Sequence, residues 1–124
     1  MHDVQFTIPA PCAWINSNQR THRMAQAALT KEWRRAGDDA IHPDWQPFEG
    51  PVHITAWITK KRGGRYDPNN LWPTIKAIVD GVVDSGLLPD DDHLHVIGPD
   101  MRHGGTGEPS VLMRIVSIRS SETP

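Results

Sequence analysis

The sequence has almost no cysteine and no long apolar run. Its 124 residues include a single cysteine, Cys12, which excludes an intramolecular disulfide and fits a reducing compartment. No apolar stretch approaches the length of a membrane span, and no signal-peptide pattern is present. A chain of this length has room for one modest core, so residues 1–124 are expected to form one domain. We therefore expect a cytoplasmic protein that does not span a membrane.

An excess of positive charge is also missing. The formal net charge is −2, whereas a protein that binds nucleic acid non-specifically is usually basic. The average conceals clustering, because residues 60–65 (KKRGGR) form a basic run and acidic residues gather at 38–44 and 90–92. A second basic group consists of Arg20, Arg23, Lys31, Arg34 and Arg35. This second group is typical of a solvated helix face, and a DNA-binding surface is the alternative.

Hydrophobic periodicity predicts two helices and about four strands. Alternation of apolar and polar residues indicates strands at 4–8 and 52–59, and shorter apolar runs indicate strands at 94–97 and 111–118. Helical spacing predicts a helix over 21–36. Its buried stripe would be Ala25, Leu29, Trp33 and Ala36, with Gly37 as its C-terminal cap.

The connecting segments and the last strand complete a two-layer α+β prediction. Trp45 and Phe48 are expected to attach the 37–51 loop to the core, and the Gly- and Pro-rich segment 98–110 is expected to be a mobile loop. The strand at 111–118 is apolar on both faces, so it lies in the centre of the sheet or is covered by a partner subunit. The order of elements is β-α-β-α-β-β, which favours a two-layer domain.

Residues 65–92 carry the chemistry and are expected to form a polar turn, a helix and an acidic loop. Asn70 is the expected N-cap, and Pro73 suits the first helical turn because its missing N–H is no loss there. Gly86 is expected to adopt the left-handed conformation that ends a helix, and Pro89 prevents continuation. The core-facing stripe of this helix is Leu71, Ile75, Ile78, Val79, Val82 and Val83.

Polar residues stand at both ends of this helix. Asp67, Asn69 and Asn70 precede it, and Asp90, Asp91 and Asp92 follow it. Lys76 and Asp80 lie one turn apart on the same face, and helical side chains lean toward the N-terminus, which would aim Lys76 back at residues 67–70. A helix of this length spans roughly 20 Å. The acidic cluster can therefore reach Asp67 only if the chain returns along the helix.

The pattern Asp67-x-Asn69-Asn70, followed by Lys76, Asp80, Gly86 and Asp90-Asp91, resembles the signature of the RusA family of Holliday junction resolvases. That family typically has Asp-x-Asp-Asn, a nearby Lys, a helical Asp, a Gly and an Asp-Asp pair. The resemblance covers about a quarter of the chain. Two departures are present: Asn69 replaces the usual second acidic residue, and three extra residues separate Asn70 from Lys76.

The resemblance implies a mixed sheet and a Mg²⁺-dependent site. Asp67, Asp90 and Asp91 would bind Mg²⁺, a hard cation that prefers oxygen ligands, and Asp92 would substitute if the register slips by one. The implied catalytic residues are Asp67, Asn69, Lys76 and Asp91. Lys76 would stabilise charge on the phosphate, or would merely pair with Asp80. Asn69 offers a carbonyl oxygen but no charge. The alternative for the acidic triplet is a solvated loop.

The residues implied to contact nucleic acid precede Asp67 or lie near the N-terminus. They are Lys60, Lys61, Arg62 and Arg65, together with Asn18 and Arg20. The guanidinium fork suits phosphate, although Gly63-Gly64 also suits a simple turn. Asn18, or Thr21, is alternatively a helix N-cap.

The sequence is compatible with three functions. The first, implied by the resemblance, is a Mg²⁺-dependent homodimeric endonuclease that resolves four-way DNA junctions by paired nicks, with a role in recombination or repair of host or phage DNA in the cytoplasm. The second is a junction-binding protein that does not cut, which Asn69 favours. The third is a His/Asp transition-metal protein that binds Zn²⁺ or Ni²⁺ through His93 and His95, with His103 as a further histidine. His93 and His95 are two residues apart, so on a strand they would share a face. Cys12 has no nucleophile motif around it.

Overall fold

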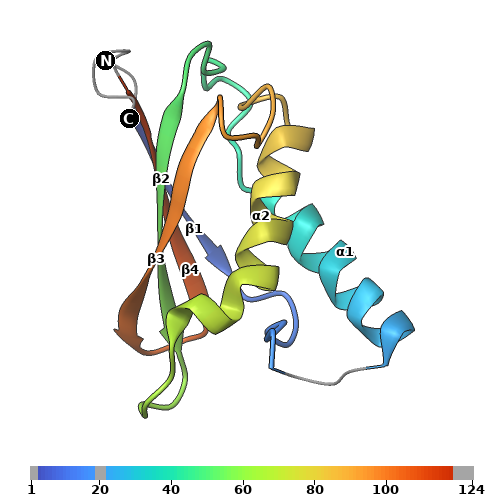
Figure 1. Cartoon of the computed structure of the whole chain (residues 1–124). Coiled ribbons are helices and arrows are strands. Elements are labelled where there is room, and N and C mark those ends of the chain that lie inside the picture. Colours follow the sequence, from blue (N-terminus) through green and yellow to red (C-terminus); the bar gives the residue numbers. More distant parts are fainter. Residues whose placement is uncertain (1–2, 19–21, 119–124) are drawn as a thin grey trace.

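The protein is a two-layer α+β domain in which both helices cover the same face of one sheet (Figure 1). The structure, a computed structural model, describes residues 3–18 and 22–118. The elements in chain order are β1 (Asp3–Pro9), α1 (Arg23–Asp39), β2 (Val52–Lys60), the 3-10 turn η1 (Pro68–Leu71), α2 (Trp72–Asp84), β3 (Val96–Thr106) and β4 (Ser110–Ser117). The predicted fold class, a β-α-β-α-β-β domain with a mixed four-stranded sheet, is confirmed over these described residues.

The sheet has the strand order β1-β4-β2-β3. β2 and β3 are parallel, because α2 carries the chain from the end of one strand to the start of the other. The other two pairings are antiparallel. Met113 of β4 lies between Phe6 of β1 and Ala56 of β2. Met113 and its alternate neighbours in β4 are buried on the face that the helices cover, while Leu112 and Val116 on the other face are only half-buried.

The core lies between the sheet and the two helices. Val4, Phe6 and Ile8 alternate with exposed residues along β1, as the sequence predicts. The predicted stripe of α2 is buried, apart from Val83, which is half-buried. Phe48 is buried and Trp45 packs against the core, so the 40–51 segment is attached to the body as expected.

Two glycines allow α1 and α2 to cross at short distance. A Cβ on Gly37 would lie 2.4 Å from the carbonyl oxygen of Ile78, and a Cβ on Gly81 would lie 2.0 Å from that of Arg34. The prediction that Gly37 caps α1 is therefore wrong, because the helix continues to Asp39 and uses this glycine for packing. The predicted stripe of α1 is correct for Trp33, which is fully buried, but Ala25 is exposed because it lies beyond the crossing.

The helix starts differ from their predictions. The side chain of His22 accepts a hydrogen bond from the backbone N–H of Met24, so His22 and not Asn18 caps α1, and Thr21 lies outside the described residues. Asp67 caps η1, which takes the place expected for Asn70. Gly86 follows α2 with a φ of +90°, as predicted for a helix end. No helix in residues 3–18 and 22–118 has the length and apolar character needed to cross a bilayer.

The segment expected to be a mobile loop is mostly strand. β3 extends to Thr106, and a short turn at 107–109 leads into β4. The glycines that suggested a loop are accommodated by irregularities in the pairing of β2 with β3. Leu94, which was placed in the strand, precedes it and is 65% exposed.

A bidentate ion pair on the surface also joins the two helices. Arg34 Nε and Nη2 donate to the carboxylate of Asp84 at 2.6 and 2.8 Å. These hydrogen bonds hold the pKa of Asp84 below its usual value, against a smaller opposing effect of desolvation. A carboxylate with a lowered folded-state pKa contributes stability above its unfolded pKa and loses it as the pH falls.

We therefore expect Asp84→Asn to lower the melting temperature at pH 7, with a difference from wild type that shrinks below a pH of about 4. Thermal unfolding followed by circular dichroism across this range measures the effect. Asp39→Asn removes an exposed carboxylate of α1 that forms no ion pair within the described chain, and serves as the control. A difference that stays constant down to pH 2 would contradict the assignment.

Candidate active site

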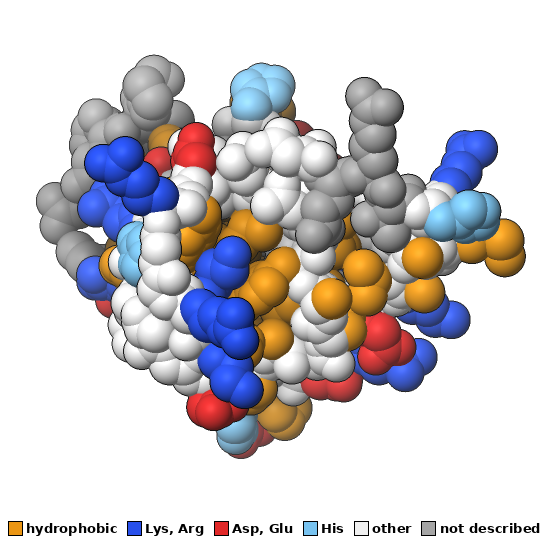
Figure 2. All heavy atoms as spheres, turned by 90° about the horizontal axis from the view of Figure 1, so that it is seen from below, with side chains coloured by type: hydrophobic (Ala, Val, Ile, Leu, Met, Phe, Trp, Pro, Cys, Tyr) orange, Lys and Arg blue, Asp and Glu red, His pale blue; other side chains and the backbone are white. Residues whose placement is uncertain are grey.

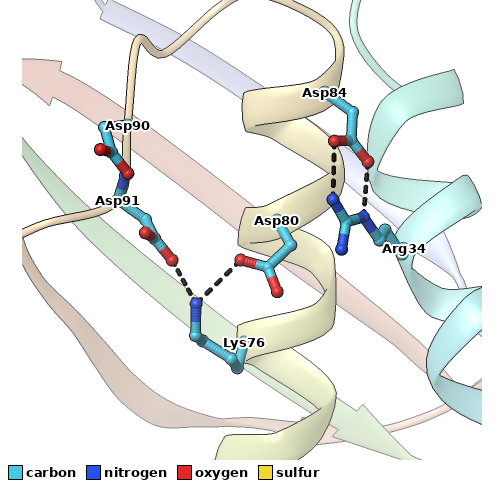
Figure 3. A network of polar contacts seen from close by, with 6 residues as sticks. All are labelled: Arg34, Lys76, Asp80, Asp84, Asp90 and Asp91. Carbon is cyan, nitrogen blue, oxygen red and sulfur yellow. Dashed lines mark hydrogen bonds and ion pairs between the residues drawn. The ribbon is translucent and has the colours of Figure 1, made fainter. Parts of the chain in front are cut away.

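The centre of the site is an ion-pair network on the N-terminal half of α2. Lys76 Nζ donates a hydrogen bond to Asp80 Oδ1 at 2.8 Å and another to Asp91 Oδ2 (Figure 3). Asp91 is fifteen residues further along the chain, so the segment after α2 returns beside the helix as far as Lys76. The predicted direction of Lys76 toward residues 67–70 is wrong. Two carboxylates on the other side attract the ammonium group and outweigh the rotamer tendency.

The electrostatics of this network fix the charge state of its members. Burial lowers the pKa of Lys76, but the hydrogen bonds and charges of Asp80 and Asp91 outweigh it and raise that pKa above its usual value. The hydrogen bond from Lys76 lowers the pKa of Asp91 despite partial burial. At neutral pH Lys76 is therefore a cation and Asp91 an anion. Lys76 can supply positive charge but is not suited to act as a base.

A cavity of about 180 Å³ opens beside this network. Its lining comes from α2, from the returning loop and from the start of β3: Trp72, Lys76, Val79, Asp91, Val96, Gly98 and Pro99. Side chains of opposite charge thus stand on one wall of a recess that is otherwise apolar. This arrangement can hold one end of a polar ligand near Lys76 and an apolar or aromatic part beside it.

Asp67 and Asn69 lie in η1, before α2. Asp67 Oδ1 accepts the backbone N–H of Asn69 at 2.9 Å, and both residues are exposed. Asp90 Oδ1 accepts a hydrogen bond from the backbone N–H of Asp91 at 2.7 Å, which orients the Asp90 carboxylate toward Asp91. Within the described chain no hydrogen bond or ion pair joins Asp67 to Asp90 or Asp91. The structure therefore groups Lys76, Asp90 and Asp91, with Asp67 and Asn69 as a second group.

The acidic residues have the right chemistry for a hard cation. Carboxylate oxygens are the ligands that Mg²⁺ prefers, and Asp90 and Asp91 offer them side by side. Over residues 3–18 and 22–118, no group of three or more His, Cys, Asp or Glu is arranged to hold a metal ion. Asp92 instead binds His95, with Asp92 Oδ1 2.6 Å from His95 Nδ1. Asp67, Asp90 and Asp91 as Mg²⁺ ligands thus remain a prediction, with Asp91 as the member that lines the cavity.

The N-terminal loop packs directly against η1 and α2. The backbone N–H of Ser17 donates to the carbonyl oxygen of Asn70 at 2.8 Å. The buried hydroxyl of Thr74 accepts the N–H of Ile15 at 2.8 Å and donates to the carbonyl of Ile15 at 2.9 Å. The exposed Asn18 directly follows Ser17, so it lies next to the residue that contacts η1. Arg20, the other residue expected here, lies outside the described residues.

Thr74→Val should destabilise the protein by about 2–4 kcal/mol, because it keeps the shape of the side chain but leaves the buried N–H and C=O of Ile15 without their partner. Urea unfolding measures the change, and the m-value shows whether unfolding stays two-state. Thr74→Ser keeps the hydroxyl and should recover most of the stability. Equal losses for the Val and Ser variants would show that the methyl group, and not the hydrogen bonds, matters.

The predicted basic run forms the connection from β2 to η1. Lys61, Arg62 and Arg65 are exposed, while Lys60 Nζ lies 4.5 Å from the centre of the Tyr66 ring. Tyr66 in turn contacts His103, with ring centres 4.9 Å apart. Viewed from the end of the molecule that carries this connection, Lys and Arg side chains lie beside hydrophobic ones (Figure 2). This surface combines exposed cations with an apolar patch.

The residues of the transition-metal hypothesis do not form a cluster. His93 and His95 precede β3 in a turn and not on a strand, so the prediction that they share a strand face is wrong. His95 pairs with Asp92, and His103 contacts Tyr66. Burial, followed by the charge of Glu32, raises the pKa of the Cys12 thiol, which makes it a poorer nucleophile.

Sequence reasoning missed Trp72, Gly98 and Pro99 as lining of the cavity. Trp72 could have been noticed, because it lies one turn before Lys76 on a helix. Gly98 and Pro99 gave no such signal, since their position depends on how β3 pairs with β2. Neither a protein-family model nor a curated protein matches this chain.

Proposed function

We propose that this protein is a Mg²⁺-dependent, structure-selective DNA endonuclease that resolves four-way junctions by paired nicks, as its resemblance to RusA resolvases implies. The observation that supports it most is the joining of Lys76 and Asp91 beside a cavity, although they are fifteen residues apart. The exposed basic connection before η1 adds a surface suited to phosphate.

The proposed roles follow from charge and position. Asp91 and Asp90, with Asp67, would hold Mg²⁺, which when bound would supply positive charge and an activated water. Lys76, a cation held by Asp80, would stabilise the negative charge that develops on the attacked phosphate. The phosphate backbone would be bound by Lys60, Lys61, Arg62 and Arg65, and by Asn18 and Arg20.

A homodimer is part of the proposal, because paired nicks require two sites. Within residues 3–18 and 22–118 the helices cover one face of the sheet, and no helix covers the other face, where a partner could pack (Figure 1). Trp57, Leu112 and Val116 alternate with core residues, lie on that open face and are half-buried. The polar side-chain contacts on that face include His53–Asp100 and Arg114–Asp3. The expected location is the host cytoplasm, acting in recombination or repair of host or phage DNA.

The second candidate is a junction-binding protein that does not cut. Asn69 has no charge where the family usually has a carboxylate, and the carboxylate of Asp67 is engaged with the backbone of η1. Both features would reduce metal affinity without affecting the basic surface.

A synthetic four-way junction incubated with Mg²⁺ or with EDTA tests the proposal. Paired nicks that require Mg²⁺ would support the endonuclease. If wild type binds the junction but leaves it intact, Asn69→Asp restores the missing carboxylate. Nicking by that variant alone would favour the second candidate for the natural protein. Neither binding nor nicking by wild type would overturn both candidates.

A further inference from the structure

Trp72 is an exposed aromatic side chain on the wall of the candidate active site. It is the first residue of α2 and is 42% exposed, whereas the core-facing apolar residues of that helix are buried. Among described residues the other exposed large hydrophobic side chains are Met24 and Leu94, and neither lines this cavity. The indole of Trp72 is therefore exposed on the wall of a cavity that also contains Lys76 and Asp91, where it can contact a ligand.

The size of the cavity limits what the indole can bind. Its volume of about 180 Å³ is below the roughly 300–1,000 Å³ of usual small-molecule sites. One flat ring system fits this space better than a large ligand does. The part of the wall that comes from β3 consists of Val96, Gly98 and Pro99.

The charged groups around the indole suit a ligand that carries phosphate once Mg²⁺ is bound in the proposed site, because the cation would offset the carboxylate of Asp91, which lines the same cavity. Lys76 lies one helical turn from Trp72 and lines the same cavity. The exposed cations Lys61, Arg62 and Arg65 shortly precede η1 in the chain. A nucleobase in a nucleic-acid strand combines these two features, because it is a flat ring joined through its sugar to a backbone of phosphodiesters.

We propose that Trp72 stacks on the exposed face of one base at the branch point of the DNA. The inference rests on the proposed function and gives it a physical basis for branch selectivity. Bases inside a duplex have both faces covered by their neighbours, whereas a base at a branch can expose one face. Stacking on Trp72 would hold the adjoining phosphate near Lys76, because the two side chains share the cavity.

Two variants of Trp72, one that keeps an aromatic ring and one that does not, test this stacking. Trp72→Phe keeps a ring, and Trp72→Leu keeps an apolar side chain without one. Met24→Ala removes an exposed apolar side chain elsewhere and is the matched control. Binding is measured at one fixed salt concentration, with Ca²⁺ in place of Mg²⁺ to prevent cutting, on a four-way junction and on a linear duplex of the same sequence.

The expected result is a 5- to 100-fold loss of junction affinity for Trp72→Leu, a smaller loss for Trp72→Phe and no change for Met24→Ala. Duplex affinity should not change in any variant. A 2-aminopurine base beside the cleaved phosphate should emit more strongly when bound to Trp72→Leu than to wild type.

The outcomes separate this inference from the function on which it rests. Equal junction affinities for Trp72→Leu and Trp72→Phe, with unchanged emission, would overturn stacking while wild-type nicking keeps the proposed function. An equal loss on junction and duplex would overturn the role in branch selectivity. Wild type that neither binds nor cuts junctions would overturn both. Melting temperatures confirm that each variant is folded.

Discussion

Replacing Asp91 by Asn should lower the rate of Mg²⁺-dependent junction nicking at least 100-fold, with little change in junction binding. In the proposed mechanism Asp91 is the metal ligand that lines the cavity, and the amide removes its negative charge. Loss of a single group that stabilises charge in the transition state typically costs 10²–10³ in rate. The side chain is partly exposed, so the folded state should tolerate the change.

Neighbouring carboxylates provide the controls for this variant. Asp80→Asn removes the other partner of Lys76 and should reduce the rate less, because Asp80 positions Lys76 and is not in the predicted metal set. Asp92→Asn removes an acid that binds His95 instead and should leave the rate close to wild type. Nicking at the wild-type rate by Asp91→Asn would contradict the assigned site. A large loss of nicking rate with Asp92→Asn alone would show that Asp92, and not Asp91, is the essential carboxylate.

Gly81→Ala should destabilise the protein by about 3 kcal/mol or more. The added Cβ would lie 2.0 Å from the carbonyl oxygen of Arg34 and 2.8 Å from the backbone nitrogen of Asp38. Backbone atoms of a packed helix cannot move aside as a flexible side chain can, so α1 and α2 must separate. Helix propensity alone would predict the opposite, a gain in stability, because alanine is favoured over glycine within an isolated helix by about 1 kcal/mol.

Urea unfolding measures this effect, and Gly50→Ala is the control because nothing lies within 4 Å of its added Cβ. We expect Gly50→Ala to stay within about 1 kcal/mol of wild type. A Gly81→Ala variant as stable as wild type would contradict the close crossing of the helices. The same crossing makes Gly37→Ala destabilising, for the same steric reason.

The sequence predicts the structure correctly where a single residue, or a short hydrophobic repeat, is enough to decide the local conformation or the buried face. Alternation along β1 and the apolar stripe of α2 predicted buried faces correctly, because burial follows directly from side-chain direction in a strand or helix. Gly86 was predicted correctly because a positive φ is a property of one residue. The acidic pair Asp90-Asp91 was singled out on motif alone, and the structure brings Asp91 to Lys76.

Predictions failed where a distant part of the chain decides the outcome. Gly37 looks like a helix cap from its neighbours, and only the approach of Ile78 gives it a packing role. Segment 98–110 looks like a loop from its composition, and only pairing with β2 makes much of it a strand. Lys76 turns toward Asp91 because the returning loop places a carboxylate there.

The sequence by itself determined the kinds of elements, their order and the charged side chains available for the proposed chemistry, since these depend on local periodicity and on residue type. Only the tertiary structure decided which of these residues meet. It joined Lys76 with Asp91, set Asp92 against His95 and made Trp72 a wall of the same cavity. These contacts depend on how closely α2, the loop that follows it and β3 pack together. Packing between segments far apart in the chain cannot be predicted from any one short segment.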